Sequence, residues 1–213
     1  MKSLVVRKME LGPIGTNAYL LWEEEGREAV LVDAPPGCAE AVEPLLDSHG
    51  LALREIWLTH GHWDHMIGAA DLAGEGVEVL GHREDRMLFE QPAVMATFAM
   101  PGLDFKPIGI SRWIEEGDEL ELWGRRVAIL HCPGHCPGNV VFWMEEERIC
   151  FVGDVIFAGS VGRADLPGGD FSVLERSIRE KIYNLPPETA LLPGHGPDTS
   201  VSAELRSNPF VRP

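Results

Sequence analysis

One stretch organises this chain: Thr59-His60-Gly61-His62-Trp63-Asp64-His65. Three of the chain's eight histidines and one aspartate fall within six consecutive positions of it. Neutral imidazole and carboxylate are the usual ligands of zinc and similar cations, so the stretch predicts a metal site. The simpler alternative is a polar turn with surface histidines. We expect His60 and His62 to project toward one point, with Asp64 and His65 at the entrance of a helix, where exposed amides favour an anionic group.

The residues on either side of this stretch favour the metal site over the polar turn. Before it, the apolar run Ile56-Trp57-Leu58 predicts a buried strand that ends at Thr59. Within it, Gly61 permits a tight turn. After it, residues 66–72 predict the first turns of a helix. The candidate ligands would therefore stand where a buried strand passes into a helix.

Length and hydropathy set the general class of protein. A chain of 213 residues suits one domain with a sizeable core or two very small ones, and we expect a single domain at residues 1–213. The sequence has no run of about 18 apolar residues, and its N-terminal apolar segment is too short for a secretory signal. We therefore expect a cytoplasmic protein that does not enter a membrane.

Charge and cysteine content argue against two further classes. The formal net charge of −16 opposes tight contact with a phosphate backbone, so no nucleic-acid partner is expected. The four cysteines show no CxxC spacing, and they are too few for a disulfide framework in a chain of this length. A zinc knuckle is therefore not predicted.

Apolar periodicity predicts strands and helices in two strand-rich halves. The expected strands are residues 4–9, 19–22, 29–32, 77–80, 119–123, 126–130, 140–144, 148–152 and, last in the chain, 189–192. The expected helices are residues 39–48, 83–90 and 171–185, the last of them capped by Asp170 or Ser172, with a final helical segment that begins at residue 201. Strand-rich halves with helices predict two packed sheets covered by helices on their outer faces.

The segment 92–110 does not fit this pattern. Phe98, Met100, Leu103 and Phe105 lie among prolines and glycines with little periodicity. One interpretation is a loop packed on the core. The other is an apolar wall beside the candidate ligands.

Three more candidate ligands share one pattern, in which an apolar strand ends and a polar residue stands in the next turn. They are His135, Asp154 and His195. A single histidine in such a turn is more often structural than a ligand. Together with the first cluster, however, the candidates comprise five histidines and two aspartates, which is enough for two metal ions that share a bridge. Asp33, at the end of a strand, is either a cap or a carboxylate that orients a ligand histidine.

These residues match a known family. The chain resembles the metallo-β-lactamase-fold hydrolases, and specifically their short glyoxalase II-like (hydroxyacylglutathione hydrolase-like) branch. The matching segments are Gly15-Thr16-Asn17-Ala18-Tyr19-Leu20, Asp33, the His60–His65 motif, the turns at His135 and His195, Gly153-Asp154, the run 162–170 (GRADLPGGD) and Asn208-Pro209-Phe210.

The resemblance implies an α+β fold, a four-layer αββα sandwich with two mixed sheets flanked by helices. By matching position, it implies that His60, His62 and His135 hold one metal ion, that Asp64, His65 and His195 hold a second, and that Asp154 bridges the two. Asp33 matches an outer carboxylate of the family. The expected cofactors are two divalent ions, with zinc preferred and with iron or manganese as the other candidates.

The activity implied is hydrolysis of a small-molecule thioester of the S-lactoylglutathione type by a hydroxide that bridges the metals, with Asp64 and Asp154 as catalytic residues. Full-length relatives carry a C-terminal helical domain that contacts glutathione, and we do not expect that domain here. Arg163 fits a basic position of the family's substrate loop, whereas Asp165 stands where an aromatic residue is usual. Arg163 would either bind a substrate carboxylate or tie down its own loop.

Three alternatives remain open. A persulfide dioxygenase with one iron ion and a lactonase would use the same fold. A non-enzymatic metal-binding protein would hold metal without turnover. Among the remaining histidines, His49 and His82 are expected at the surface or in caps, and His131 is expected to be structural or to hydrogen-bond near a ligand. Cys136 is expected to pack in the interior.

Overall fold

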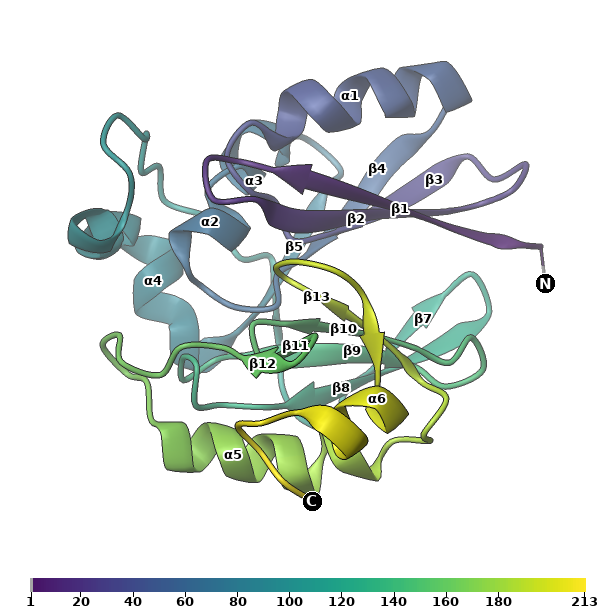
Figure 1. The fold of residues 1–213 in the computed structure, drawn as a ribbon. Coiled ribbons are helices and arrows are strands. Elements are labelled where there is room, and N and C mark those ends of the chain that lie inside the picture. Colours follow the sequence, from purple (N-terminus) through teal and green to yellow (C-terminus); the bar gives the residue numbers. More distant parts are fainter. Residues whose placement is uncertain (1) are drawn as a thin grey trace. The chain divides into compact units, whose positions relative to one another are not determined.

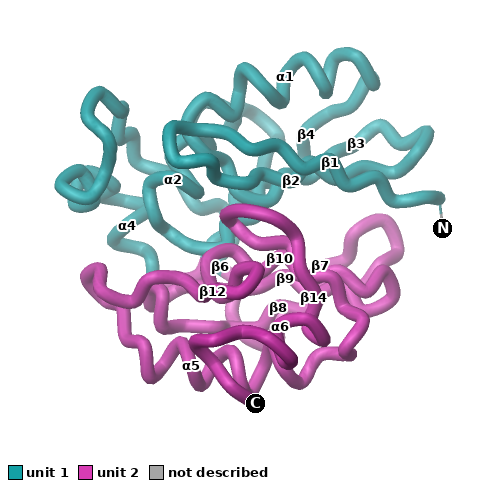
Figure 2. The backbone as a smooth tube through the Cα atoms, in the orientation of Figure 1, with its two compact units in different colours: residues 1–81, 85–113 teal, residues 82–84, 114–213 magenta. Residues whose placement is uncertain are grey.

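The computed structural model describes residues 2–213 and contains two compact units, shown in different colours in Figure 2. Unit 1 comprises Met1–Gly81 and Asp85–Trp113, and unit 2 comprises His82–Glu84 and Ile114–Pro213. The structure contains two mixed six-stranded sheets flanked by helices, so the predicted α+β class is confirmed. The assignment of residues 1–213 to a single domain stays a prediction.

The sheet of unit 1 has the strand order β1-β2-β3-β4-β5-β6 (Figure 1). Its strands are β1 (Leu4–Leu11), β2 (Thr16–Glu23), β3 (Glu28–Val32), β4 (Ala52–Trp57), β5 (Glu78–His82) and β6 (Arg112–Ile114). The helices along this part of the chain are α1 (Cys38–His49), α2 (Trp63–Met66), α3 (Ala69–Leu72) and α4 (Arg86–Glu90), with the 3-10 turns η1 (Arg83–Asp85) and η2 (Pro92–Phe98).

Strand direction in unit 1 brings three connections to one edge of the sheet. Strands β1, β2 and β3 form an antiparallel meander, whereas β3, β4 and β5 are parallel. Helix α1 makes the crossover that a parallel β3–β4 pair requires. Because the carboxyl ends of parallel strands share an edge, the residues that follow β3, β4 and β5 lie there together. Those residues are Asp33, the Thr59–His65 stretch and Asp85.

The sheet of unit 2 has the strand order β14-β13-β10-β9-β8-β7, and β11 and β12 form a separate two-stranded hairpin (Figure 1). The strands are β7 (Glu119–Leu122), β8 (Arg125–His131), β9 (Val140–Met144), β10 (Ile149–Gly153), β11 (Ile156–Phe157), β12 (Ser160–Val161), β13 (Ala190–Pro193) and β14 (Thr199–Ser200). The helices are α5 (Phe171–Glu180) and α6 (Val201–Ser207), with the 3-10 turn η3 (Ile182–Asn184).

Helices α5 and α6 cover one face of this second sheet. Leu174 and Ile178 of α5 and Val201 of α6 are fully buried in a core with strand residues such as Val141 and Val152. Helix α5 begins where the sequence predicts, because the carboxylate of Asp170 accepts the backbone N–H groups of Ser172 and Val173.

The carboxyl ends of three strands also share one edge in unit 2. Strands β8 and β10 both run antiparallel to β9, and β13 is parallel to β10, so all three point the same way. The turn bearing His135 follows β8, Asp154 follows β10, and His195 follows β13. The Gly194 N–H donates to the Gly153 carbonyl over 2.8 Å, which joins two of these strand ends directly.

Several boundaries differ from the sequence prediction. The single helix expected over residues 66–72 is two short helices, because the Gly68 N–H donates to the Ala34 carbonyl over 2.9 Å instead of to the carbonyl four residues before it. The final strand is β14 rather than the strand at residues 189–192, and part of segment 92–110 is the 3-10 turn η2. Across residues 2–213, no helix has the length and hydropathy needed to cross a membrane.

Candidate metal centre

The histidines of the Thr59–His65 stretch face one another in unit 1. The ring centroids of His60 and His62 are 4.8 Å apart with the planes nearly perpendicular, and those of His60 and His65 are 4.1 Å apart. All three side chains are buried, as is Asp64. Asp64 and His65 lie in the first turn of α2 rather than ahead of it. A buried cluster of imidazoles and a carboxylate is incompatible with the alternative of a polar turn with surface histidines.

Asp33 is hydrogen-bonded to two residues of the Thr59–His65 stretch. Its carboxylate is buried and accepts hydrogen bonds from the Thr59 N–H (2.8 Å), the Thr59 hydroxyl (2.8 Å) and His65 Nδ1 (2.7 Å). Its backbone has φ +58°, a left-handed conformation that aspartate tolerates better than most residues. The side chain therefore contacts a candidate ligand histidine, which is one of the two roles considered for it from the sequence.

These hydrogen bonds determine which nitrogen of each ring carries the proton. His65 donates through Nδ1–H to Asp33, so the neutral ring keeps a lone pair on Nε2. The Thr59 hydroxyl donates to Asp33, so its oxygen accepts from His60 Nδ1–H over 3.0 Å. Asp33 thus orients His65 directly and His60 through Thr59. Imidazoles that bind metals are usually held by their second nitrogen in this way.

One hydrogen bond holds Asp64 in place. The Thr16 hydroxyl donates to Asp64 Oδ2 over 3.0 Å, and both residues are buried. The same carboxylate oxygen lies 3.2 Å from His65 Nε2. Thr16 was identified in the sequence only as part of a family motif, and its contact spans 48 residues of chain, which no local pattern reveals.

Asp85 was missed by the sequence analysis. Its buried carboxylate accepts the Gly61 N–H over 2.8 Å, between the two histidines of the loop. A Cβ atom at Gly61 would lie 2.8 Å from the Leu88 Cβ, so the loop packs directly on α4. The signal that could have identified Asp85 is the same one used elsewhere, a polar side chain shortly after a strand end.

In unit 2, Asp154 lies between two histidines. Its Oδ2 atom is 3.5 Å from His135 Nε2 and 3.6 Å from His195 Nε2. His135 and Asp154 are buried, whereas the His195 side chain is 25% exposed. The ring of Phe157 meets that of His195 edge-on, with centroids 5.9 Å apart. One carboxylate oxygen that faces two imidazoles suits a bridging ligand.

The loop after the β11–β12 hairpin supports His135. Its Nδ1–H donates to the Arg163 carbonyl over 2.7 Å, which leaves the Nε2 lone pair facing Asp154. Gly162 lies so close to Asp154 that an added Cβ atom would be 1.8 Å from the Asp154 carbonyl oxygen. Only glycine fits at this position, so the loop is packed onto the ligand residues.

The Arg163 side chain points to its neighbour Asp165. Its Nε and Nη2 atoms donate to the two carboxylate oxygens of Asp165 over 2.7 and 2.8 Å. The hydrogen bonds from this guanidinium lower the pKa of Asp165 to about 2. Both side chains are more than half exposed, so the pair is in contact with solvent and is readily exchanged for another partner.

The donor atoms of both units fit divalent cations. In their neutral forms, His60, His65 and His135 would each present an Nε2 lone pair, and carboxylate oxygens lie 3.2 Å from His65 Nε2 and 3.5 Å from His135 Nε2. Two lone pairs at such distances repel unless a cation or proton lies between them. Imidazole nitrogen and carboxylate oxygen are the ligands that zinc, iron and manganese share.

The cysteines do not offer a nucleophile in place of a metal. All four are buried with free thiols. Burial raises the pKa of Cys38 and of Cys132 to about 12, and that of Cys150 well above its ordinary value. Thiols of this kind are not ionised near neutral pH and are inert. Cys136 is fully buried, in agreement with the predicted packing role.

The remaining histidines lie outside this donor set. His49 is exposed, as expected. His82 was expected at the surface or in a cap. It is buried, with its ring stacked on that of His131 at 4.1 Å between centroids, and its Nδ1 accepts the Glu84 N–H over 3.3 Å at the start of η1, which is the contact of a cap. His131 Nε2 donates to the Pro137 carbonyl over 2.7 Å, which supports the turn bearing His135. His131 therefore has a structural hydrogen bond next to a candidate ligand.

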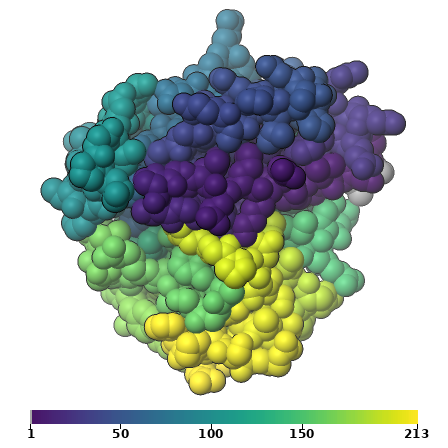
Figure 3. Space-filling view, turned by 45° about the horizontal axis from the view of Figure 1, so that its top comes forward, coloured from purple at the N-terminus to yellow at the C-terminus, as the bar shows by residue number. Residues whose placement is uncertain are grey.

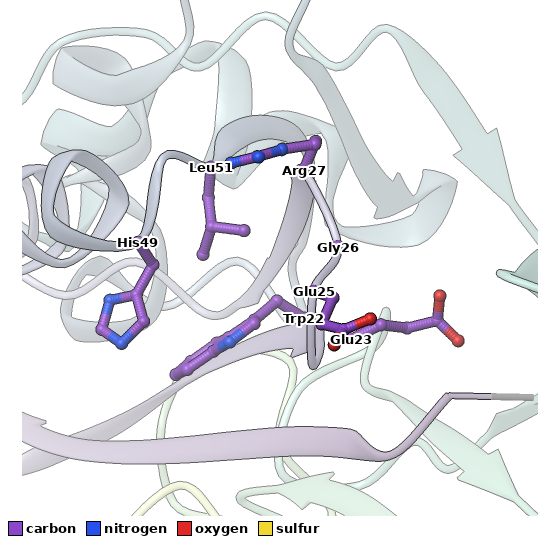
Figure 4. Close-up of a pocket in the computed structure, with 7 residues that line it drawn as sticks. All are labelled: Trp22, Glu23, Glu25, Gly26, Arg27, His49 and Leu51. Atoms are coloured by element: carbon purple, nitrogen blue, oxygen red, sulfur yellow. The ribbon is translucent and has the colours of Figure 1, made fainter.

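A surface pocket of unit 1 offers no comparable chemistry. Figure 4 shows the rings of Trp22 and His49 and the side chain of Leu51 around one hollow, beside the turn that carries Arg27. The ring centroids of Trp22 and His49 are 5.2 Å apart. None of the candidate ligands lines this pocket. The histidine and aspartate clusters are therefore the better candidate for the functional site.

The sequence matches a known family over most of its length. Residues 11–195 match the family model of the metallo-beta-lactamase superfamily. The chain is 40% identical over 200 residues to the hydroxyacylglutathione hydrolase GloC of Haemophilus influenzae, and the match covers 92% of each chain.

Two solved structures extend the likeness to the fold. TTHA1623 in a di-iron-bound form has a TM-score of 0.83 and 40% identity, with 97% of this chain and 100% of the other covered. The BLEG-1 B3 metallo-beta-lactamase has a TM-score of 0.85 and 37% identity, with 97% and 99% covered. The match thus extends over nearly the whole of all these chains.

Proposed function

Because this chain belongs to the metallo-beta-lactamase superfamily and is a metallo-hydrolase of that family, we propose that it hydrolyses small thioesters of the S-lactoylglutathione type. The observation that carries the proposal is the pair of donor clusters, in which imidazole Nε2 atoms face carboxylate oxygens at the strand ends of each unit. The thioester class is supported by 40% identity to a hydroxyacylglutathione hydrolase.

We assign the ligands by matching each residue to the family motif. One divalent ion would be held by His60, His62 and His135. A second would be held by Asp64, His65 and His195. Asp154 would bridge them, which suits a carboxylate oxygen that already faces two imidazoles in unit 2.

A pair of divalent cations in such a site supplies a water of lowered pKa and polarises the carbonyl that is attacked. The chain's own groups do the remaining work. Asp64 is held by the Thr16 hydroxyl and is the carboxylate we propose to accept the proton from the attacking water. Asp33 keeps His60 and His65 in the tautomers that leave Nε2 available to a metal. The leaving group is the thiolate of the substrate's thiol carrier. No cysteine of the chain assists it, because the four thiols are buried and burial raises the pKa of Cys132 to about 12.

Zinc is the preferred ion in this proposal, with iron and manganese as the other candidates. All three accept imidazole and carboxylate ligands, so the donor set does not discriminate among them. Support for iron comes from the similarity to TTHA1623, which was solved in a di-iron-bound form.

Arg163 is the residue we propose to contact a carboxylate of the substrate's thiol carrier. Its backbone carbonyl holds His135, so the side chain stands on the same loop as a ligand contact. The Arg163 guanidinium donates two hydrogen bonds to the Asp165 carboxylate. An anionic substrate would displace Asp165. Both side chains are solvent-exposed, so loss of the ion pair between them costs little free energy.

Metal analysis combined with a thioester assay tests the proposal. Purified protein is expected to contain about two equivalents of metal, by the ligand count above, and to hydrolyse S-lactoylglutathione. His60→Ala and Asp154→Ala should lose both metal and turnover, whereas Glu175→Ala, a substitution on the surface of α5, should lose neither. Full activity in metal-depleted Asp154→Ala would contradict the proposal.

The same assays separate the alternatives. One iron ion per chain with oxygen uptake on glutathione persulfide would indicate a dioxygenase. Hydrolysis of homoserine lactones without thioester turnover would indicate a lactonase. Bound metal with no turnover on any ester or thioester would indicate a metal-binding protein. Each of these results would replace the thioesterase proposal.

A further inference from the structure

We propose that Glu204 and Asn208, near the C-terminus, are positioning residues that hold the β11–β12 hairpin, and through it the three ligand residues of unit 2. The inference rests on the proposed function, because it takes His135, Asp154 and His195 as metal ligands. Neither Glu204 nor Asn208 touches those ligands. Their effect would pass through residues 156–163.

Glu204 is a buried carboxylate at the meeting point of three segments. Only 3% of the surface of Glu204 is exposed to solvent. Oε2 accepts the Gly159 N–H over 3.0 Å and the Asn208 amide over 2.9 Å, and Oε1 accepts the Thr199 hydroxyl over 2.6 Å. Gly159 lies at the hairpin turn, Thr199 lies just beyond the His195 turn, and Asn208 follows α6. One side chain therefore joins the hairpin, the start of β14 and the C-terminal segment.

Asn208 completes the connection from the other side. Its amide group also donates to the Ser160 carbonyl over 3.0 Å, so Gly159 in the turn and Ser160 directly after it are both bound. Its carbonyl oxygen accepts the N–H groups of Phe210 and Val211 over 2.9 and 3.3 Å. Asn208 is 1% exposed. This gives a role to the Asn208-Pro209-Phe210 motif, which the proposed mechanism leaves unused.

Tyr183 lies beside Glu204 and hydrogen-bonds to the C-terminal segment. The tyrosine hydroxyl donates to the Val211 carbonyl over 2.9 Å. Burial, and then the nearby Glu204 carboxylate, raise the pKa of Tyr183 to about 12. The hydrogen-bond partners of Glu204 are neutral donors, and no ion pair involves it among residues 2–213. Burial of a carboxylate is unfavourable unless its hydrogen bonds are satisfied. Both oxygens of Glu204 accept hydrogen bonds, so the buried carboxylate is compatible with a stable fold.

The hairpin in turn contacts all three ligand residues of unit 2. Its first strand begins at Ile156, two residues after Asp154. Gly162, which follows its second strand, packs against the Asp154 carbonyl. Phe157, in its first strand, meets the His195 ring edge-on at 5.9 Å. The next residue, Arg163, holds His135 through its carbonyl at 2.7 Å. A hairpin that shifts would therefore move the support of every ligand in this unit.

The two strands of the hairpin cannot hold this position alone. They pair through only two residues on each side, Ile156 with Val161 and Phe157 with Ser160. An isolated two-stranded hairpin is at best marginally stable in water. In the space-filling view, yellow atoms of the C-terminal segment lie beside green atoms from the middle of unit 2 (Figure 3). The C-terminal segment therefore supplies the support that strand pairing lacks.

The test compares Glu204→Ala with the conservative Glu204→Gln. Glutamine keeps one oxygen for Gly159 and Asn208 and turns its amide toward the Thr199 hydroxyl, which can accept, so it should rescue. Arg206→Ala, an exposed position of the same helix, is the matched control. Asn208→Asp places an acceptor where a donor serves Ser160 and Glu204, and it should resemble Glu204→Ala.

The first measurement is amide hydrogen exchange on the metal-free proteins, read for peptides that cover residues 156–163. Glu204→Ala is expected to exchange at least tenfold faster there, with little change in unit 1. The second is zinc affinity by chelator competition, expected to weaken at least tenfold in Glu204→Ala and less than threefold in Glu204→Gln and Arg206→Ala. With substrate, kcat should fall more than KM rises, since no substrate contact is removed.

Three results would overturn the inference: unchanged exchange in the hairpin, faster exchange spread evenly over the chain, or a loosened hairpin with native zinc affinity. If Glu204→Ala does not fold, Thr199→Val removes one donor at constant shape and should give a smaller change of the same pattern. Native protein that binds zinc but hydrolyses no thioester would refute the proposed substrate and leave this inference standing, because neither exchange nor affinity depends on turnover.

Discussion

The carboxylate of Asp33 offers the sharpest test of how the imidazoles are oriented. Asp33→Asn preserves the shape of the side chain, and asparagine tolerates φ +58° at least as well as aspartate. The substitution replaces one of two oxygens that together accept three hydrogen bonds. It therefore changes hydrogen bonding and charge while it leaves packing and backbone conformation alone.

Either orientation of the new amide leaves a donor facing a donor. If the NH2 group takes the Oδ1 position it meets the Thr59 N–H, which cannot reverse. If it takes the Oδ2 position it meets His65 Nδ1–H, and the ring escapes only by moving its proton to Nε2, where it can no longer bind a cation. A buried donor left without an acceptor costs about 1–3 kcal/mol. Loss of a partner that orients a ligand histidine typically weakens metal binding about 10–100-fold.

Two measurements check this prediction. Zinc affinity by competition with a chromophoric chelator should weaken about 10–100-fold in Asp33→Asn. The melting temperature of the metal-free protein should fall by roughly 2–4 °C per kcal/mol lost, the scale for a chain of this size. Asp33→Ala should melt lower still, because alanine adds roughly 1–2 kcal/mol of left-handed strain. A zinc affinity for Asp33→Asn within twofold of the native protein would refute the reasoning.

Three further predictions concern other parts of the chain. Asp165→Asn should lower KM for anionic thioesters with kcat unchanged, because Arg163 loses its internal competitor; an unchanged KM would argue against substrate binding by Arg163. Gly162→Ala should abolish metal binding and activity, since its Cβ would lie 1.8 Å from a backbone oxygen, whereas Gly109→Ala, with nothing within 4 Å, should match the native protein in both assays. His82 should contribute to acid sensitivity: burial, and then a neighbouring histidine, hold its pKa below the ordinary 6.5, so the unfolded chain takes up the proton first and stability falls as pH drops from about 7 toward the folded pKa. In chemical unfolding at pH 7 and pH 5.5, His82→Phe should lose less stability on acidification than the native protein, and an equal loss would contradict this role.

The turns that carry the candidate ligands were predicted from the sequence because their signals are local. Each candidate ligand stands just after an apolar run, and each such run is a strand that ends at the predicted edge of its sheet. Period-2 alternation and Gly/Pro turns do not depend on distant residues, so the two mixed sheets and the Asp170 cap were predicted and are confirmed. How the seven ligands meet around two ions stays a prediction.

What the sequence did not reveal are contacts between distant segments. Thr16 bonds to Asp64 across 48 residues, and Glu204 bonds to Gly159 across 45. Neither pair has a periodic or motif signal that would connect its members. The break in the helix at Gly68 arises because its N–H donates to the Ala34 carbonyl, again in another part of the chain. The burial of His82 was not predicted for a similar reason, since only the fold brings His131 alongside it.

The candidate ligands stand in connections and at the first turn of a short helix, and none of them lies within a strand. The paired strands can therefore remain constant in evolution while the residues presented at their ends are exchanged, so the same scaffold can acquire different metal preferences and substrates. Conversely, strand pairing cannot compensate for a substitution that displaces a ligand in one of these connections. Substitutions at these turns should consequently alter chemistry before they alter folding, and descendants of one ancestral architecture can diverge in reaction while they remain alike in shape.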